Sequence, residues 1–201
     1  MKKIIAIVAF VAAMFVAGNA QAQMSVRFGY APETTTSKYN ALSPNGNYNG
    51  FFAGVFNTFD LKSGLNLTAG VQGRMNMKSK KDSYVNETVK DRQLLVEVPI
   101  TLSYGLGFGK NVKVSPFVGP VVSFALSGKT TTEGLVNQSF DWYGDNSNFN
   151  RLNLSAMGGV NVKYVRLNLF AGYQMGLLDL NKSDNGTLKT SGYFVGLGYD
   201  L

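Results

Sequence analysis

The chain has 201 residues, a formal net charge of +7, and neither cysteine nor histidine. Disulfides are therefore excluded, and the commonest general base and metal ligand is missing. The positive charges are dispersed rather than gathered in a basic stripe with interleaved aromatics, so nucleic-acid binding is not expected.

The first 22 residues are typical of a secretory signal peptide. Two lysines precede an apolar run over 4–17, and Ala20-Gln21-Ala22 follows. The run has fourteen residues, fewer than the roughly 20 that a membrane-spanning helix needs. We expect cleavage after Ala22, which leaves one domain over residues 23–201. The loss of two lysines lowers the formal charge from +7 to +5.

Eight later segments alternate apolar with small or polar residues, the period of a β-strand with two unlike faces. Seven have a clear apolar face. The second carries apolar groups on both faces, so its outward face stays unassigned and a bulge is one interpretation. In chain order the predicted strands are 24–31, 50–59, 65–75, 94–104, 112–126, 152–164, 167–175 and 193–201.

The connections alternate in length. Long polar connections are predicted over 32–48, 78–92, 127–150 and 179–190. Short turns are predicted over 60–64, over 105–111 and near Val165, where the alternation changes phase. Two prolines, Pro116 and Pro120, predict a bulge or kink within the fifth strand.

An even number of strands with long loops at one end and short turns at the other indicates a closed sheet embedded in lipid. Only closure satisfies every backbone polar group in hydrocarbon. The sequence therefore predicts an all-β fold, an eight-stranded antiparallel up-and-down transmembrane β-barrel with both termini in the periplasm. Six aromatics then form two belts at the membrane interfaces. They are Tyr30, Phe124 and Tyr193 in the outer belt, and Tyr104, Tyr164 and Tyr199 in the inner belt.

Five segments carry a family resemblance: 50–72, 96–107, 115–129, 170–180 and the closing YFVGLGYDL. In these segments the chain resembles the porin-family outer-membrane β-barrel proteins, within the class of short eight-stranded barrels such as the OmpX and OmpA membrane domains. The resemblance implies the bacterial outer membrane, contact with its lipid, and assembly by the barrel-insertion machinery. In that class the last strand usually ends in an aromatic residue, whereas this chain ends in Leu201.

The lumen of an eight-stranded barrel is just wide enough for side chains to fill. Because isolated buried charge is costly, we expect a hydrogen-bonded plug, with Arg74 and Glu97 as an ion pair on neighbouring strands. The alternative is a narrow porin-like channel for small solutes or ions. The inward polar candidates are Arg27, Gln72, Arg74, Glu97, Thr101, Arg151, Asn153, Asn161, Arg166, Asn168 and Gln174.

No catalytic, cofactor-binding or metal-binding residue is predicted, and no cofactor is expected. The enzymes found on barrels of the resembling class depend on a histidine beside Ser or Asp, and this chain has none. We therefore expect a non-enzymatic protein with a structural or surface-interaction role. A monomer is expected.

The 127–150 connection holds four aromatics, Phe140, Trp142, Tyr143 and Phe149, among Asp and Asn. Such a cluster favours contact with an extracellular partner or a sugar; the other interpretation is packing on the barrel rim or in the headgroup zone. A soluble lipocalin-like ligand-binding barrel is a further alternative, with the apolar face turned inward. The abundance of small residues on the second face suits a cramped lumen better than a solvated exterior.

Overall fold

The structure is a computed structural model that describes residues 22–38, 45–82, 87–134, 137–143, 149–181 and 186–201. The predicted signal peptide, apart from Ala22, lies outside these residues. No helix in the described part of the chain is long and apolar enough to cross a membrane.

Almost all of the described chain is β-strand, with a short 3-10 turn over Lys62–Gly64. The strands are β1 (Ala22–Tyr30), β2 (Glu33–Lys38), β3 (Asn45–Asp60), β4 (Leu65–Asp82), β5 (Glu87–Tyr104), β6 (Leu106–Phe108), β7 (Val112–Glu133), β8 (Gln138–Asp141), β9 (Leu152–Tyr164), β10 (Leu167–Gly176) and β11 (Thr187–Asp200).

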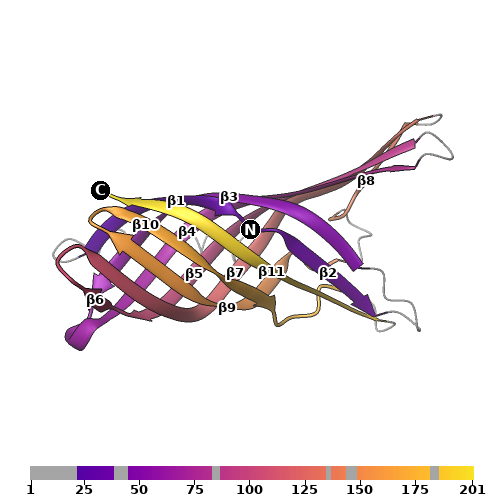
Figure 1. Ribbon diagram of the computed structural model, residues 1–201. Coiled ribbons are helices and arrows are strands. Elements are labelled where there is room, and N and C mark those ends of the chain that lie inside the picture. The colour runs from indigo at the N-terminus through magenta and orange to yellow at the C-terminus, as the bar shows by residue number, and fades with distance from the viewer. Residues whose placement is uncertain (1–21, 39–44, 83–86, 135–136, 144–148, 182–185) are drawn as a thin grey trace.

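These strands form one closed antiparallel barrel (Figure 1). The sheet closes because β1 pairs with β11 on one side and with β3 on the other. Three short strands add no new position in the wall: β2 continues β1, β6 continues β5, and β8 pairs with β7 beyond the end of β9. The barrel therefore has the eight positions that the sequence predicts.

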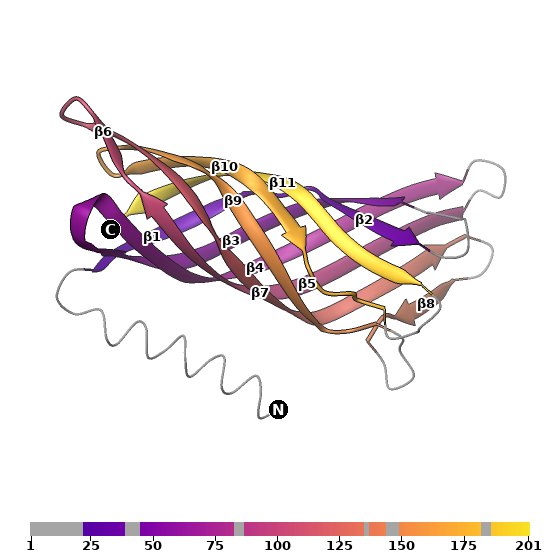
Figure 2. The same cartoon turned by 90° about the horizontal axis from the view of Figure 1, so that it is seen from below.

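The end of the barrel that holds the C-terminus matches the predicted short turns. Figure 2 shows β6, the turn between β9 and β10, and the C-terminus at one end. The β9–β10 turn is tight and contains Val165 with a positive φ of 57°, at the position where the sequence alternation changes phase. Both observations agree with short turns on the side of the termini.

At the other end, the strands are longer than predicted. The 78–92 segment is not a loop, because β4 runs to Asp82 and β5 starts at Glu87. Similarly, β2 and the start of β3 lie in 32–48, while β8 and the end of β7 lie in 127–150. Figure 1 shows β4, β5 and β7 rising past the rest of the wall, with β8 beside them. We call residues 76–82, 87–93, 127–133 and 138–141 the outer ribbon.

The irregularity of β7 lies at Leu126 and not at its prolines. The register between β5 and β7 shifts between Leu94 and Leu95, which leaves Leu126 as the extra residue. At Pro116 and Pro120 the register with β9 is continuous. Both prolines lie where the β5–β7 ladder records no pair, so their missing N–H groups cost no ladder bond. The bulge suggested for the second predicted strand is also absent, since β3 keeps one register with each neighbour along its described length.

The apolar face of the strands looks outward. Tyr193, Val195 and Leu197 are 72%, 46% and 50% exposed, whereas Phe194, Gly196 and Gly198 between them are buried. Strand β3 turns Phe51 and Val55 outward and buries Phe52 and Phe56, which settles the face that its sequence left unassigned. The six predicted belt aromatics all occupy the outward face.

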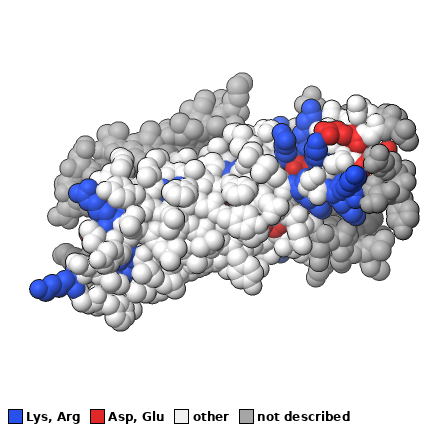
Figure 3. All heavy atoms as spheres, turned by 45° about the horizontal axis from the view of Figure 1, so that its top comes forward, with Lys and Arg blue, Asp and Glu red and all other residues white. Residues whose placement is uncertain are grey.

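Charged side chains gather toward the two ends of the visible face, with a nearly uncharged band between them (Figure 3). An exterior of this kind suits hydrocarbon rather than water. It excludes the soluble ligand-binding barrel, because that fold would need the apolar side chains inside.

Candidate functional site: the barrel lumen and its outer mouth

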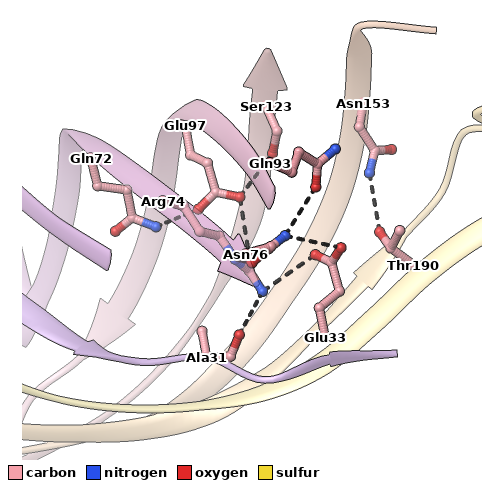
Figure 4. Close-up of polar contacts among 10 residues, drawn as sticks. All are labelled: Ala31, Glu33, Gln72, Arg74, Asn76, Gln93, Glu97, Ser123, Asn153 and Thr190. Atoms are coloured by element: carbon pink, nitrogen blue, oxygen red, sulfur yellow. Dashed lines mark hydrogen bonds and ion pairs between the residues drawn. The ribbon is translucent and has the colours of Figure 1, made fainter. Parts of the chain in front are cut away.

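A buried ion network closes the outer part of the lumen around Arg74, whose side chain is 4% exposed. Its guanidinium nitrogens lie 3.5 Å from Glu97 Oε1 and 3.3 Å from Glu33 Oε2. Nη2 also donates to the carbonyl oxygen of Ala31 at 2.9 Å, and Nε donates to Asn76 Oδ1 at 3.1 Å (Figure 4). The cation is thus held from four sides, as a buried charge requires.

The two carboxylates have further donors. Glu97, 2% exposed, accepts hydrogen bonds from Gln72 Nε2 at 2.6 Å and Ser123 Oγ at 3.1 Å. Asn76 Nδ2 donates to Glu33 Oε1 at 3.3 Å and to Gln93 Oε1 at 3.1 Å. Sequence reasoning identified the Arg74–Glu97 pair but missed Glu33, which stands in a Thr- and Pro-rich segment assigned to a loop. It also missed Asn76 and Gln93, which lie past the predicted strand ends.

Aromatic rings meet across the lumen on the periplasmic side of this network. Phe52, Phe170 and Phe194 are buried against Ala31, and Phe117 packs against them. The ring centroids of Phe52 and Phe170 lie 6.0 Å apart, and those of Phe170 and Phe194 lie 6.4 Å apart. Sequence reasoning considered only polar residues as inward candidates. The odd position of Phe170 on the small-residue face of its strand was the available signal.

A cavity of about 100 Å³ extends from the periplasmic mouth of the barrel toward Arg74. Near the mouth, Asp200 accepts from Lys163 Nζ at 2.6 Å and from Asn168 Nδ2 at 2.8 Å. Seven of the predicted inward residues line this cavity: Arg27, Gln72, Arg74, Thr101, Asn161, Asn168 and Gln174. A smaller cavity of about 20 Å³ lies toward the outer mouth and is lined by Glu97, Arg151 and Asn153 among others.

Two of the predicted lumen arginines do not lie deep inside the lumen. The Arg166 side chain is exposed in the β9–β10 turn, although its carbonyl oxygen accepts hydrogen bonds from the Asp200 N–H at 2.9 Å and from Asn168 Nδ2 at 3.5 Å. The prediction of an inward side chain is wrong here because the alternation of the 167–175 strand was extended one residue back into the turn. Arg151 sits at the rim of the outer mouth and donates to the carbonyls of Ala125, Leu126 and Tyr143. Asn153, deeper inside, donates to Thr190 Oγ1 at 3.3 Å (Figure 4).

The four aromatics of the predicted surface loop do not form one exposed patch. Trp142 donates from Nε1 to Thr130 Oγ1 at 2.8 Å and packs edge-on against Tyr48. Tyr143 accepts a hydrogen bond from Gln93 Nε2 at 2.6 Å and lies under the Arg151 guanidinium. Both therefore pack on the mouth of the barrel. Phe140 is 60% exposed on β8, and Phe149 is 36% exposed.

Tyr143 stands outside the membrane-spanning strands. Burial raises the pKa of its phenol, and the hydrogen bond from Gln93 opposes this rise only in part. The phenol is therefore neutral at physiological pH. Among the residues that the structure describes, no group of three or more Asp and Glu side chains could hold a metal ion.

The chain matches the family model of the outer membrane protein beta-barrel domain over residues 18–182. No curated protein sequence matches it. Similar solved structures include Ail, the attachment invasion locus protein of Yersinia pestis, in complex with the heparin analogue sucrose octasulfate. That match has 14% identity and a TM-score of 0.51, and covers 90% of this chain and 99% of that chain.

A second crystal structure of Ail matches with 14% identity, the same coverage of 90% and 99%, and a TM-score of 0.50. Neisserial surface protein A matches with 14% identity over 89% of this chain and 97% of that chain, with a TM-score of 0.46. At such low identity, the two Ail structures show a shared barrel fold. With the family match spanning most of the sequence and the closed, lipid-facing barrel, the chain belongs to the outer membrane protein beta-barrel domain family.

Proposed function

We propose that this outer-membrane barrel is a non-enzymatic surface protein that binds an extracellular partner with its outer ribbon, while side chains close its lumen. The observation that carries the proposal is the outer ribbon itself. It rises past the barrel wall (Figure 1) and presents exposed charged and aromatic side chains beyond the apolar band. A barrel that served only as an anchor would not need this extension.

The outward face of the ribbon favours an acidic saccharide as partner. Lys81, Arg92 and Lys129 are exposed there, and none forms an ion pair with an acidic group among the described residues. The register places Arg92 directly opposite Lys129, and like charges in that position repel. An anionic ligand would relieve this repulsion. Phe140 is the cross-strand partner of Thr130 and not of Lys129, so it lies on the other face of the ribbon.

Charge on the ribbon is mixed but positive in sum. Lys90 pairs with Glu133 at 2.6 Å, and Asp141 is the cross-strand partner of Lys129. The heparin analogue bound by Ail is a sulfated sugar, and a sulfated polysaccharide is therefore the first ligand to test on this chain.

The test is binding of fluorescently labelled heparin to cells that express the protein. The double variant Arg92→Gln/Lys129→Gln should lower cell-bound fluorescence at least about fivefold, whereas Phe140→Ser, on the other face of the ribbon, should leave it unchanged. Lys110→Gln is the charge-loss control, because Lys110 is exposed in the turn beside β6 at the opposite end of the barrel. Equal binding by the wild type and the double variant would reject the proposal.

A closed lumen is supported by the Arg74 network, which caps the cavity at its outer end, and by the rings of Phe52, Phe170 and Phe194, which narrow that cavity. Small barrels with such filling do not conduct readily. Planar-bilayer recordings of the purified protein should show no stable open level, and a steady large conductance would favour the porin-like channel instead.

A non-enzymatic role is supported by the state of the internal carboxylates. Glu33 and Glu97 are acidic side chains of the lumen that meet at Arg74, and both are bound to it. A general acid or base needs a free proton-accepting position beside its substrate, which neither has.

For biogenesis, we propose export with cleavage after Ala22, insertion by the barrel-assembly machinery, and a monomeric state in outer-membrane lipid. The pairing of β1 with β11 supports the role of the machinery, since the barrel closes only when the last strand is in place. The mass of the protein extracted from envelopes tests the cleavage, and its size in detergent tests the monomer.

A further inference from the structure

A guanidinium inside the periplasmic part of the lumen lacks an acidic partner. Arg27 points inward from β1, and its Nε donates to Ser25 Oγ at 3.3 Å. No carboxylate oxygen of the described chain lies within 4 Å of it, and neither Nη group hydrogen-bonds to a described residue. A guanidinium carries five N–H donors. Because Arg27 lines the cavity, the donors on its two Nη atoms are available to a ligand there.

Neighbouring groups hold this guanidinium in place without neutralising it. It lies 4.5 Å from the ring centroid of Phe56 and 5.7 Å from that of Phe170, which are cation–π distances. The nearby carboxylate of Asp200 is already taken by Lys163 and Asn168. A bound anion would therefore complete the charge balance at Arg27.

A second unused polar group flanks the same ring. Asn161 is the cross-strand partner of Phe170, and its Nδ2 donates to Asn168 Oδ1 at 3.1 Å. Its Oδ1 is buried and has no hydrogen-bond partner. Asn161 and Arg27 line the same cavity. Phe170 thus has a guanidinium with spare donors near its ring and a residue with a spare acceptor as its cross-strand partner.

We propose that this cavity binds a small hydroxylated carboxylate that enters from the periplasm. The carboxylate accepts hydrogen bonds from the Arg27 Nη groups in the two-pronged geometry that guanidinium favours. The hydroxyl donates to Asn161 Oδ1, and the carbon chain lies against Phe170. The cavity of about 100 Å³ is smaller than the roughly 150 Å³ that holds benzene, which limits the ligand to about two or three carbons.

The direction of entry follows from the ends of the cavity. Gln23, Asp60 and Lys113 line it at the periplasmic mouth, while the Arg74 network caps the other end. The site is therefore separate from the outer ribbon and does not depend on the function proposed for that surface.

The test is an NMR titration of the ¹⁵N-labelled barrel in detergent micelles at constant ionic strength. Glycolate and acetate differ only by the hydroxyl, and chloride controls for charge. Glycolate should give saturable shifts at the amides around Arg27 and Phe170, acetate should bind more weakly, and chloride should give none. Arg27→Met should weaken glycolate binding by at least about tenfold, while Lys110→Met, with the same loss of charge in the exposed 109–111 turn, should not.

Asn161→Leu should remove the preference for glycolate over acetate and leave acetate binding in place. Arg27→Lys keeps the positive charge but loses the paired N–H donors that match a carboxylate, so it should also weaken binding. This variant replaces Arg27→Met in the test if Arg27→Met does not fold. The proposal is overturned if neither carboxylate gives saturable shifts, if either Arg27 variant binds like the wild type, or if Asn161→Leu still prefers glycolate.

Discussion

Arg74 is the residue on which the outer part of the lumen depends, because it is the cation between the buried carboxylate of Glu97 and the partly buried carboxylate of Glu33. The pair with Glu97 is buried on both sides, at 4% and 2% exposure. In contrast, the pair of Lys90 with Glu133 is 39% and 51% exposed on the ribbon. Loss of the cation should therefore lower the free energy of unfolding much more at the buried pair than at the exposed pair.

We predict that Arg74→Met destabilises the barrel by about 3–5 kcal/mol, because Glu33 and Glu97 are left buried without a cation. Lys90→Met, the control, should cost less than about 1 kcal/mol. Urea unfolding in phospholipid vesicles, followed by the gel mobility of unheated samples, measures both. Similar losses for the two variants would show that the internal network contributes no more than an exposed pair.

At the scale of strands, close approach in the wall constrains particular glycines. A side chain at Gly119 of β7 would overlap the carbonyl oxygen of Ile100 on β5, whereas one at Gly73 of β4 would meet nothing within 4 Å. Gly73 lies on the exposed outward face and Gly119 on the inward face. Both glycines thus lie within long wall strands, and they differ in the room that is available for a side chain.

We therefore predict that Gly119→Ala prevents most of the protein from reaching the heat-modifiable folded form, since the overlap is with backbone that cannot move alone. Gly73→Ala should fold like the wild type, or slightly better, because alanine restricts the unfolded chain. Folding yield from urea into detergent micelles is the measurement. Normal folding of Gly119→Ala would mean that β5 and β7 separate there at little cost.

Strand existence could be predicted where one face meets lipid, and strand ends could not. Tyr193, Val195 and Leu197 face lipid and alternate with residues that face the lumen, mostly glycines. The sequence therefore predicts both the strand β11 and its outward face. In the outer ribbon both faces of the strands meet water, so pairs such as Lys80 and Val89 across β4 and β5 show no alternation of apolar and polar residues. Glu33 was missed for the same reason. The sequence predicts a bulge at Pro116 or Pro120, whereas the bulge lies at Leu126. The sequence does not reveal whether the missing N–H of a proline would have faced a neighbouring strand.

Across the whole molecule, the environment of each side chain follows from a cylinder with an apolar exterior and polar ends. The outward residues of β11 pass from Lys189 in the outer part through Val195 to Tyr199, and charge is confined to the outer end on that face. The uncharged band in Figure 3 shows the same division over several strands. Depth along the barrel should therefore decide the cost of a new charge.

We predict that Val195→Arg, in the middle of the apolar band and 46% exposed, costs about 2–4 kcal/mol, because the guanidinium must enter hydrocarbon. Thr187→Arg, on the same face of the same strand at its outer end, should cost about 0–1 kcal/mol because it remains at the interface. Unfolding in vesicles gives both values. Transferring the two variants to a detergent with a thin, mobile micelle should reduce their difference, since water then reaches the middle of the barrel wall. A difference that persists unchanged in the micelle would assign the cost to packing in the wall instead of to lipid.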